Sequence, residues 1–146
     1  MKKLLFLFTT LLLISCSSED DNETSETKTF LEKNDGLGFY NGEDFYTFFY
    51  NDDVFLKEVD PEDVGESFCV EYREGTNNVN GLTFNVEILT NDSERLIVKF
   101  INNSGDEGTT EYIVDSTQNE LTVEYDNDGD PDTFFKTTTT YSSLCN

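Results

Sequence analysis

Four carboxylates stand at alternate positions of one short loop, on Asp126, Asp128, Asp130 and Asp132. Calcium favours such loops because it takes roughly six to eight oxygen ligands. An EF-hand loop that began at Asp126 would need a glycine where Pro131 stands, and it would need a bidentate glutamate at its end. The loop therefore predicts at most weak calcium binding, and a solvated hairpin tip is the alternative interpretation.

Catalysis by an imidazole base is excluded, because the 146 residues contain no histidine. Ser/His/Asp and Cys/His arrangements and histidine-bearing zinc sites are excluded with it. Two carboxylates suffice for a glycosidase, but the chain has 31 acidic residues, too many for spacing to single out a pair. We expect no enzymatic activity and no cofactor beyond weakly bound calcium, and a hydrolase is the remote alternative.

Aromatic residues are concentrated near the start of the predicted domain. Eight of the 20 lie within positions 39–55: Phe39, Tyr40, Phe45, Tyr46, Phe48, Phe49, Tyr50 and Phe55. Such a cluster could line a pocket for a small apolar ligand, since aromatic rings supply much of the contact area in such sites. The candidate ligand-contacting residues are Phe45, Tyr46, Phe48 and Tyr50. Core packing and coverage of an edge strand are the alternative explanation.

The first 15 residues read as a signal peptide. Lys2 and Lys3 precede an apolar run of 11 residues, Leu4–Ile14, which is too short for a membrane span of roughly 20 residues. Leu13-Ile14-Ser15-Cys16 resembles the lipobox, in which the cysteine is acylated and the chain is cut before it. We therefore expect lipidation at Cys16, with two or three acyl chains anchoring the protein stably to a membrane. Ordinary secretion with cleavage elsewhere is the alternative.

Residues 16–29 are predicted to be the lipidated cysteine and a flexible tether, because positions 17–29 hold five acids, one base and no apolar side chain. The opening Ser17-Ser18-Glu19-Asp20-Asp21 resembles the serine and acid signal of Bacteroidota lipoproteins. That resemblance implies an outer-membrane protein that faces the cell exterior. A solvated linker without an address is the alternative.

The charge of the chain restricts its partners. The formal net charge is −22, and removal of residues 1–15 would take away two basic residues and no acidic one. A surface this negative repels phosphate backbones and anionic lipid. We therefore expect no nucleic-acid partner and contact with the membrane only through the lipid anchor.

Cys69 and Cys145 remain as an even pair once Cys16 is assigned to lipid. In a compartment outside the cytosol, such a pair predicts a disulfide. Cys69 alternates with Phe68, Val70 and Tyr72, so we expect its thiol on the polar face of its strand.

From Phe30 onward, apolar residues recur at every second position, which is typical of half-buried antiparallel strands. Examples are Leu82 to Ile88, Leu96 to Phe100 and Leu121 to Tyr125, and a last strand is led by Phe134 or Phe135. Turn residues separate the runs, among them Gly75-Thr76-Asn77-Asn78. The pattern predicts an all-β fold, an up-and-down meander of about eight or nine strands that closes, or nearly closes, into a barrel without exposed edges.

The layout of the chain is similar to that of small lipocalin-like lipoproteins of flavobacteria and other Bacteroidota. The likeness rests on the lipobox, the acidic tether, Phe30-Leu31-Glu32-Lys33, and Cys69 with a partner in Ser142-Ser143-Leu144-Cys145. Lipocalins open with Gly-x-Trp, where this chain has Gly38-Phe39-Tyr40. The resemblance implies a lipocalin-like domain over residues 30–146.

The predicted function is that of a non-enzymatic surface lipoprotein whose lipocalin-like barrel binds a small apolar ligand. The alternative is a structural or protein-interaction module that displays an acidic face. An open barrel interior would favour the first function, and a lumen filled by side chains would favour the second.

Overall fold

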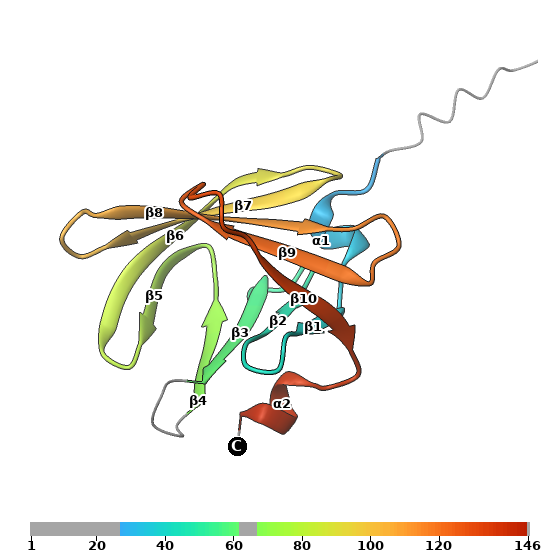
Figure 1. Ribbon diagram of the computed structural model, residues 1–146. Helices are drawn as coiled ribbons and strands as arrows, with labels where there is room; N and C mark the ends of the chain where they lie inside the picture. Colours follow the sequence, from blue (N-terminus) through green and yellow to red (C-terminus); the bar gives the residue numbers. More distant parts are fainter. Residues whose placement is uncertain (1–26, 62–66, 146) are drawn as a thin grey trace, which may run out of the picture.

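The computed structural model describes residues 27–61 and 67–145, which form one ten-stranded antiparallel sheet curled into a nearly closed barrel (Figure 1). The predicted signal peptide, Cys16 and the tether up to residue 26 lie outside these residues. The strands are β1 (Gly38–Tyr40), β2 (Phe45–Phe48), β3 (Leu56–Pro61), β4 (Ser67–Tyr72), β5 (Gly75–Val79), β6 (Leu82–Asn91), β7 (Arg95–Asn102), β8 (Glu107–Val114), β9 (Glu120–Tyr125) and β10 (Asp132–Thr137). The two short helices are α1 (Phe30–Lys33) and α2 (Tyr141–Leu144).

The strands follow one another around the barrel as a meander, which confirms the predicted fold class. The sheet order is β4-β3-β2-β1-β10-β9-β8-β7-β6-β5, so the first and last strands pair in the middle of the sheet. Its two edges are therefore β4 and β5, which are consecutive in the chain. We call the junction between them the seam.

The predicted turn over Gly75–Asn78 is wrong, because these residues belong to β5 and raise the strand count to ten. The chain turns instead at Asn80 and Gly81, between the paired residues Val79 and Leu82. Both turn residues have positive φ, 51° and 83°, as a two-residue hairpin of this kind requires. Asn-Gly is the stronger turn signal of the two segments.

Large apolar side chains fill the end of the barrel that lies next to α1, which we call the base. Phe48 makes edge-on contacts with the rings of Phe30 and Tyr112, at centroid distances of 5.0 and 5.6 Å. The fully buried residues around them include Phe39, Leu56, Val86, Leu96, Val98, Leu121, Val123 and Phe134. Each such ring pair adds about 0.5–1.5 kcal/mol beyond the burial of its area.

Helix α1 closes the base. Thr29 caps it, accepting a hydrogen bond from the Glu32 amide and donating its own amide to the Glu32 carboxylate. The Leu31 amide donates to Asn91 Oδ1, and Gln118 Nε2 donates to the Lys33 carbonyl. Thr29, predicted to end the tether, therefore belongs to the folded domain.

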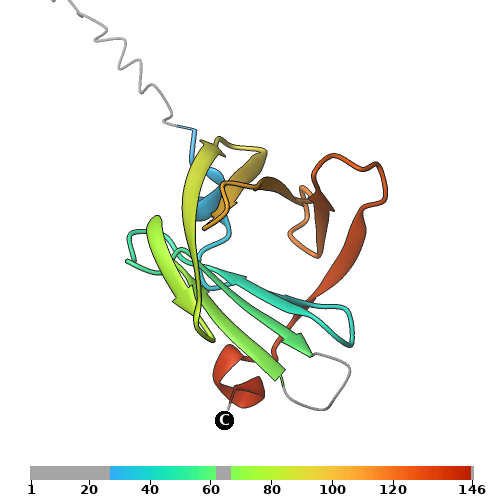
Figure 2. The same cartoon turned by 90° about the vertical axis from the view of Figure 1, so that its left-hand side faces the viewer.

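The C-terminal segment after β10 crosses the outside of the barrel, where α2 contacts β2 and β3 (Figures 1 and 2). Lys57 Nζ lies 5.0 Å from the centroid of the Tyr141 ring, a cation–π contact. The predicted disulfide is confirmed, with Cys145 bonded to half-buried Cys69 on β4 and a Cα–Cα distance of 5.9 Å. The segment thereby ties the edge strand β4 to the opposite end of the chain.

Candidate functional site

The inward positions of β2 and β3 change in character along the barrel axis. Towards the base they carry Phe48 and Leu56, and one step further they carry Tyr46 and Glu58. Beyond these, the same alternation places Asp44 and Asp60 at the opposite end, which we call the mouth. The barrel is therefore apolar at its base and acidic at its mouth.

Tyrosine hydroxyls surround Glu58 in the tier between these two zones. The Tyr72 hydroxyl donates to Glu58 Oε2 at 2.6 Å, and the Tyr46 hydroxyl donates to Oε1 at 2.9 Å. The Tyr125 hydroxyl lies 2.7 Å from that of Tyr46. Four side chains from β2, β3, β4 and β9 thus share one network across the lumen.

Burial governs the protonation of this network. It raises the pKa of the Glu58 carboxyl, against the two tyrosine hydrogen bonds that lower it. Burial also raises the pKa of Tyr125 to about 12, and it raises the pKa of Tyr46 and Tyr72 further, with the Glu58 charge adding to each. The tyrosines therefore remain hydrogen-bond donors throughout the neutral range.

The acids at the mouth repel one another. Burial raises the pKa of Asp44, and repulsion from Asp60 and Asp132 adds to the effect. Within residues 27–61 and 67–145, neither these three aspartates nor Glu58 forms an ion pair. The mouth therefore carries negative charge that the described basic residues do not balance.

An open groove of about 630 Å³ lies beside this network, between β4, β6 and the β7–β8 turn. Its apolar surface comes from Tyr72, Leu82, Phe84 and Phe100. Leu82 is 72% exposed, which is unusual for a large apolar side chain flanked by aromatic rings. Ligand sites are commonly concave, apolar and roughly 300–1,000 Å³ in volume, and this groove falls within that range.

The polar rim of the groove is held in place by the β7–β8 turn. Asn102 Oδ1 accepts hydrogen bonds from the amides of Ser104 and Asp106, at 2.8 and 3.0 Å. Asn102 Nδ2 donates to the Asp106 carboxylate at 2.9 Å. The groove therefore has an apolar floor and an ordered polar edge on one side.

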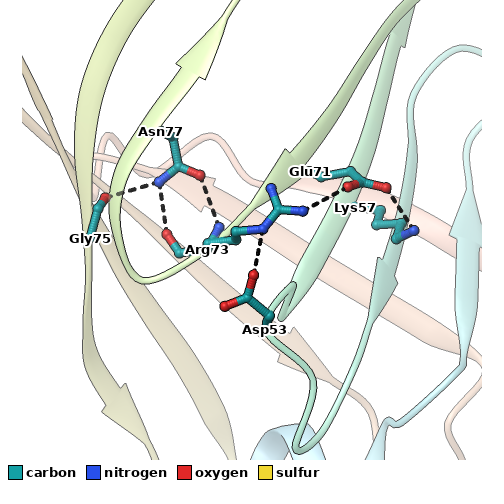
Figure 3. A network of polar contacts seen from close by, with 6 residues as sticks. All are labelled: Asp53, Lys57, Glu71, Arg73, Gly75 and Asn77. Carbon is teal, nitrogen blue, oxygen red and sulfur yellow. Dashed lines mark hydrogen bonds and ion pairs between the residues drawn. The ribbon is translucent and has the colours of Figure 1, made fainter.

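A second polar network fixes the seam next to Tyr72 (Figure 3). Buried Asn77 on β5 donates to the carbonyls of Arg73 and Gly75, and it accepts from the Arg73 amide. The Arg73 side chain pairs with Asp53 at 2.8 Å and with Glu71 at 3.1 Å. Asn77 thus holds the short link between β4 and β5 to β5, and the Arg73 side chain holds that link to β4 and to the β2–β3 loop.

The four aromatic residues predicted to contact a ligand do not form one pocket. Tyr46 and Phe48 point into the lumen, where they are buried in the core, and Tyr46 bonds Glu58. Phe45 points outward and is buried beside a separate cavity of about 410 Å³ under the C-terminal segment. Tyr50 lies beyond β2 and is 40% exposed. Three of the four are thus buried in the wall or core of the barrel, and their contact with a ligand stays a prediction.

Two carboxylates of the predicted calcium loop accept hydrogen bonds from backbone amides, one on β8 and one within the β9–β10 turn. Asp126 accepts a hydrogen bond from the Thr109 amide at 2.6 Å, and Asp128 accepts one from the Asp130 amide at 3.0 Å. Asp132 begins β10 and adds to the negative mouth. In the described part of the chain, no three acidic or cysteine side chains gather as metal ligands would.

A third cavity, of about 620 Å³, lies between α1 and the β8–β9 turn. Seven of its ten lining residues are polar, among them Lys33, Asn34, Asp115 and Gln118. These polar groups bond one another or nearby backbone, and the cavity lacks the aromatic floor of the groove beside Tyr72.

Sequence reasoning missed Glu58 and the groove residues as a site. Phe84 and Phe100 had been identified only as inward strand positions, and their meeting depends on the register Phe84↔Asn102 and Val86↔Phe100. A signal for Glu58 did exist, because the run Leu56-Lys57-Glu58-Val59-Asp60 puts acids at the parity of a core residue. An acid at a core position indicates a bonded or functional carboxylate.

Comparison with models of protein families, with curated proteins and with solved structures finds no match for this chain. Neither α1 nor α2, the helices of the described residues, is long and apolar enough to cross a bilayer.

Proposed function

We propose that this protein is a lipid-anchored binding protein of the outer membrane, whose barrel holds a small molecule with an apolar body in the groove between Tyr72, Leu82, Phe84 and Phe100. The proposal assigns no chemical reaction to the domain. The barrel supplies a rigid frame, and the groove supplies the contact surface.

The groove itself is the observation that supports this proposal. Its aromatic floor is continuous, with the Tyr72 and Phe100 ring centroids 5.4 Å apart and those of Phe84 and Phe100 6.3 Å apart. Leu82 lines the same groove and remains exposed, so a ligand could bury it at little structural cost. Burying apolar surface stabilises a complex by roughly 25 cal/mol per Å² before the cost of association is subtracted.

Binding of phenylnaphthylamine, a neutral apolar dye that fluoresces in apolar surroundings, tests the proposal. We expect the full-length chain to enhance its fluorescence saturably and Leu82→Gln to weaken binding. Leu89→Gln is the matched control, because Leu89 lies on the same strand, is 52% exposed and is outside the groove. Equal binding by both variants and the parent chain, or no saturable binding, would overturn the assignment of the groove.

The anchor is the second part of the proposal, and it rests on Leu13-Ile14-Ser15-Cys16 and the acidic segment that follows. Cys16→Ala should prevent acylation and yield an uncleaved or released product. Fractionation of cells that produce the variant measures this. Recovery of a cleaved Cys16→Ala protein that is tightly bound to the membrane would contradict it.

A protein-interaction module is the alternative, and the filled base favours it, because a ligand cannot enter the region around Phe48 and Tyr112. Under this function the acidic mouth would face a basic protein partner. Loss of the dye signal through Leu82→Gln would favour the ligand-binding function over this alternative.

A further inference from the structure

The charged residues that line the groove, Asp106 and Glu107, are both acidic. Asp106 stands on the rim, and the described residues that line the groove include no lysine or arginine. Glu107, also on the rim, is paired with Lys99 at 3.0 Å. The groove therefore has an unneutralised acidic edge on the side of the β7–β8 turn.

Tyr72, on the β4 side of the groove, connects it to a second group of acidic side chains. The ring of Tyr72 forms part of the groove floor, while its hydroxyl is 2.6 Å from the Glu58 carboxylate. Asp60 and Asp44 repel the Glu58 charge from the mouth. A group that binds on the Tyr72 ring therefore lies in a groove whose rim carries Asp106, on a tyrosine whose hydroxyl contacts the Glu58 carboxylate.

The aromatic floor suits the same kind of group. Phe84 and Phe100 each contact Tyr72, at centroid distances of 6.1 and 5.4 Å, so the three rings adjoin, tilted or edge-on to one another. Ring faces carry negative electrostatic potential and attract organic cations, and they also bury apolar carbon. Carboxylates and ring faces together disfavour an anion and favour an amine with an apolar body.

We propose that the groove selects a small amphipathic organic cation, with its apolar body on Leu82, Phe84 and Phe100 and its ammonium group against Tyr72 and the neighbouring carboxylates. This inference rests on the proposed function and names the chemical class of its ligand. A fatty acid or other anionic amphiphile is disfavoured by the same charges.

Three probes that share a phenylpropyl body and differ in charge test the inference: phenylpropylammonium, phenylpropanol and phenylpropionate. Titration of the full-length chain, followed by amide chemical shifts in NMR spectra, gives the Kd of each. We expect phenylpropylammonium to bind with a Kd about tenfold below that of phenylpropanol. Phenylpropionate should bind most weakly, and added salt should reduce the difference.

Variants separate a local effect from the general attraction of an acidic protein for cations. Glu58→Gln and Asp106→Asn should each raise the Kd of phenylpropylammonium and leave that of phenylpropanol nearly unchanged. Glu120→Gln is the control, since it changes the net charge equally on an exposed residue outside the groove. Should Glu58→Gln disturb the fold, Asp106→Asn on the exposed rim still provides the test.

The outcomes distinguish this inference from the proposed function. Equal Kd values for the three probes, all raised by Leu82→Gln, would overturn the cation preference and leave ligand binding in place. An ammonium preference that Glu120→Gln reduces as much as Asp106→Asn does would also overturn it, because net charge alone would then explain the preference. No binding of any probe would overturn both proposals.

Discussion

The Tyr72 hydroxyl donates a hydrogen bond of 2.6 Å to Glu58, and the ring of the same tyrosine forms part of the floor of the open groove. Tyr72 therefore connects the acid network of the lumen to the surface that a ligand can reach. A change in the charge of Glu58 should therefore alter both the stability of the fold and the binding of a ligand in the groove.

The first prediction concerns the pH dependence of stability through Glu58. Burial raises the pKa of its carboxyl in the folded protein above the unfolded value, so the folded state holds its proton more tightly. The stability associated with this group is full below the unfolded pKa and is lost as the pH rises through the folded pKa. The Glu58→Gln variant cannot ionise at this position. Its melting temperature relative to that of the parent chain should therefore increase as the pH rises from about 4 to about 8.

Melting curves of both proteins across that range measure the difference. Glu58→Gln also removes one hydrogen-bond acceptor, which shifts the melting temperature by the same amount at every pH. Only the pH-dependent part of the difference in melting temperature therefore tests the prediction. Asp60→Asn, on the exposed neighbour of the same strand, serves as the control for repulsion at the mouth. A difference that shrinks as the pH rises would show that the pKa of Glu58 is not raised.

The second prediction concerns the disulfide. Cys69 and Cys145 are separated by 76 residues, and the chain-entropy treatment gives a contribution of at most about 4.5 kcal/mol for a loop of that length. Cys145→Ser should therefore lower the melting temperature markedly and preserve strand content in circular dichroism. Cys69→Ser should lower the melting temperature as much as the double variant in which both Cys69 and Cys145 are replaced by serine. Two free thiols in the unreduced protein would contradict the bond.

Alternation along the strands was sufficient to predict the fold class, because one face of each strand is buried. It did not decide which of Phe134 and Phe135 is the inward residue that leads the last strand. The structure shows Phe134 buried and Phe135 57% exposed. The pairing of Phe134 with Leu121 decides this register, and that is a long-range contact. A one-residue slip would exchange the two rings.

The candidate site was less predictable, because it depends on which strands meet. Leu82 has the parity of Phe84 and was expected in the core, yet it follows the Asn80-Gly81 turn and lies at the open end. The dense aromatic run of residues 39–55 was the stronger sequence signal, but most of it packs the barrel. Composition identifies aromatic surface and does not identify which part remains exposed.

The third prediction concerns calcium at the β9–β10 turn. Asp126 and Asp128 already accept backbone hydrogen bonds, so we expect a Kd nearer the roughly millimolar class than the sensor class. Calorimetric titration measures it, with magnesium as the control ion. Micromolar binding that both Asp128→Ala and Asp130→Ala abolish would contradict this expectation.

The fourth prediction concerns Asp115 in the β8–β9 turn. Its carboxylate accepts hydrogen bonds from the Thr117 hydroxyl and from the amides of Glu120, Asn119 and Thr117, and these lower its pKa to about 2. A carboxyl whose pKa is lowered by folding stabilises the folded state at pH values above its pKa in the unfolded chain. This stability is lost as the pH falls towards 2. Asp115→Asn should lower the melting temperature at pH 7, and the difference should shrink in acid. Thr117→Val, which removes only the hydroxyl, should have a smaller effect of the same sign.

The last prediction concerns the seam, which Asn77 holds together. Its side chain is 4% exposed and makes three hydrogen bonds to backbone: to the carbonyls of Arg73 and Gly75, at 2.7 and 2.9 Å, and from the Arg73 amide at 3.0 Å. Asn77→Ala leaves these groups without partners, at a cost of roughly 1–3 kcal/mol for each one that water cannot reach. We expect a lower melting temperature and faster amide hydrogen exchange over residues 73–79. Asn78→Ala is the matched control, since Asn78 is exposed and its side chain makes one long contact, of 3.4 Å, with Thr83. If the two variants exchanged and melted alike, Asn77 would not be what holds the link between β4 and β5 in place.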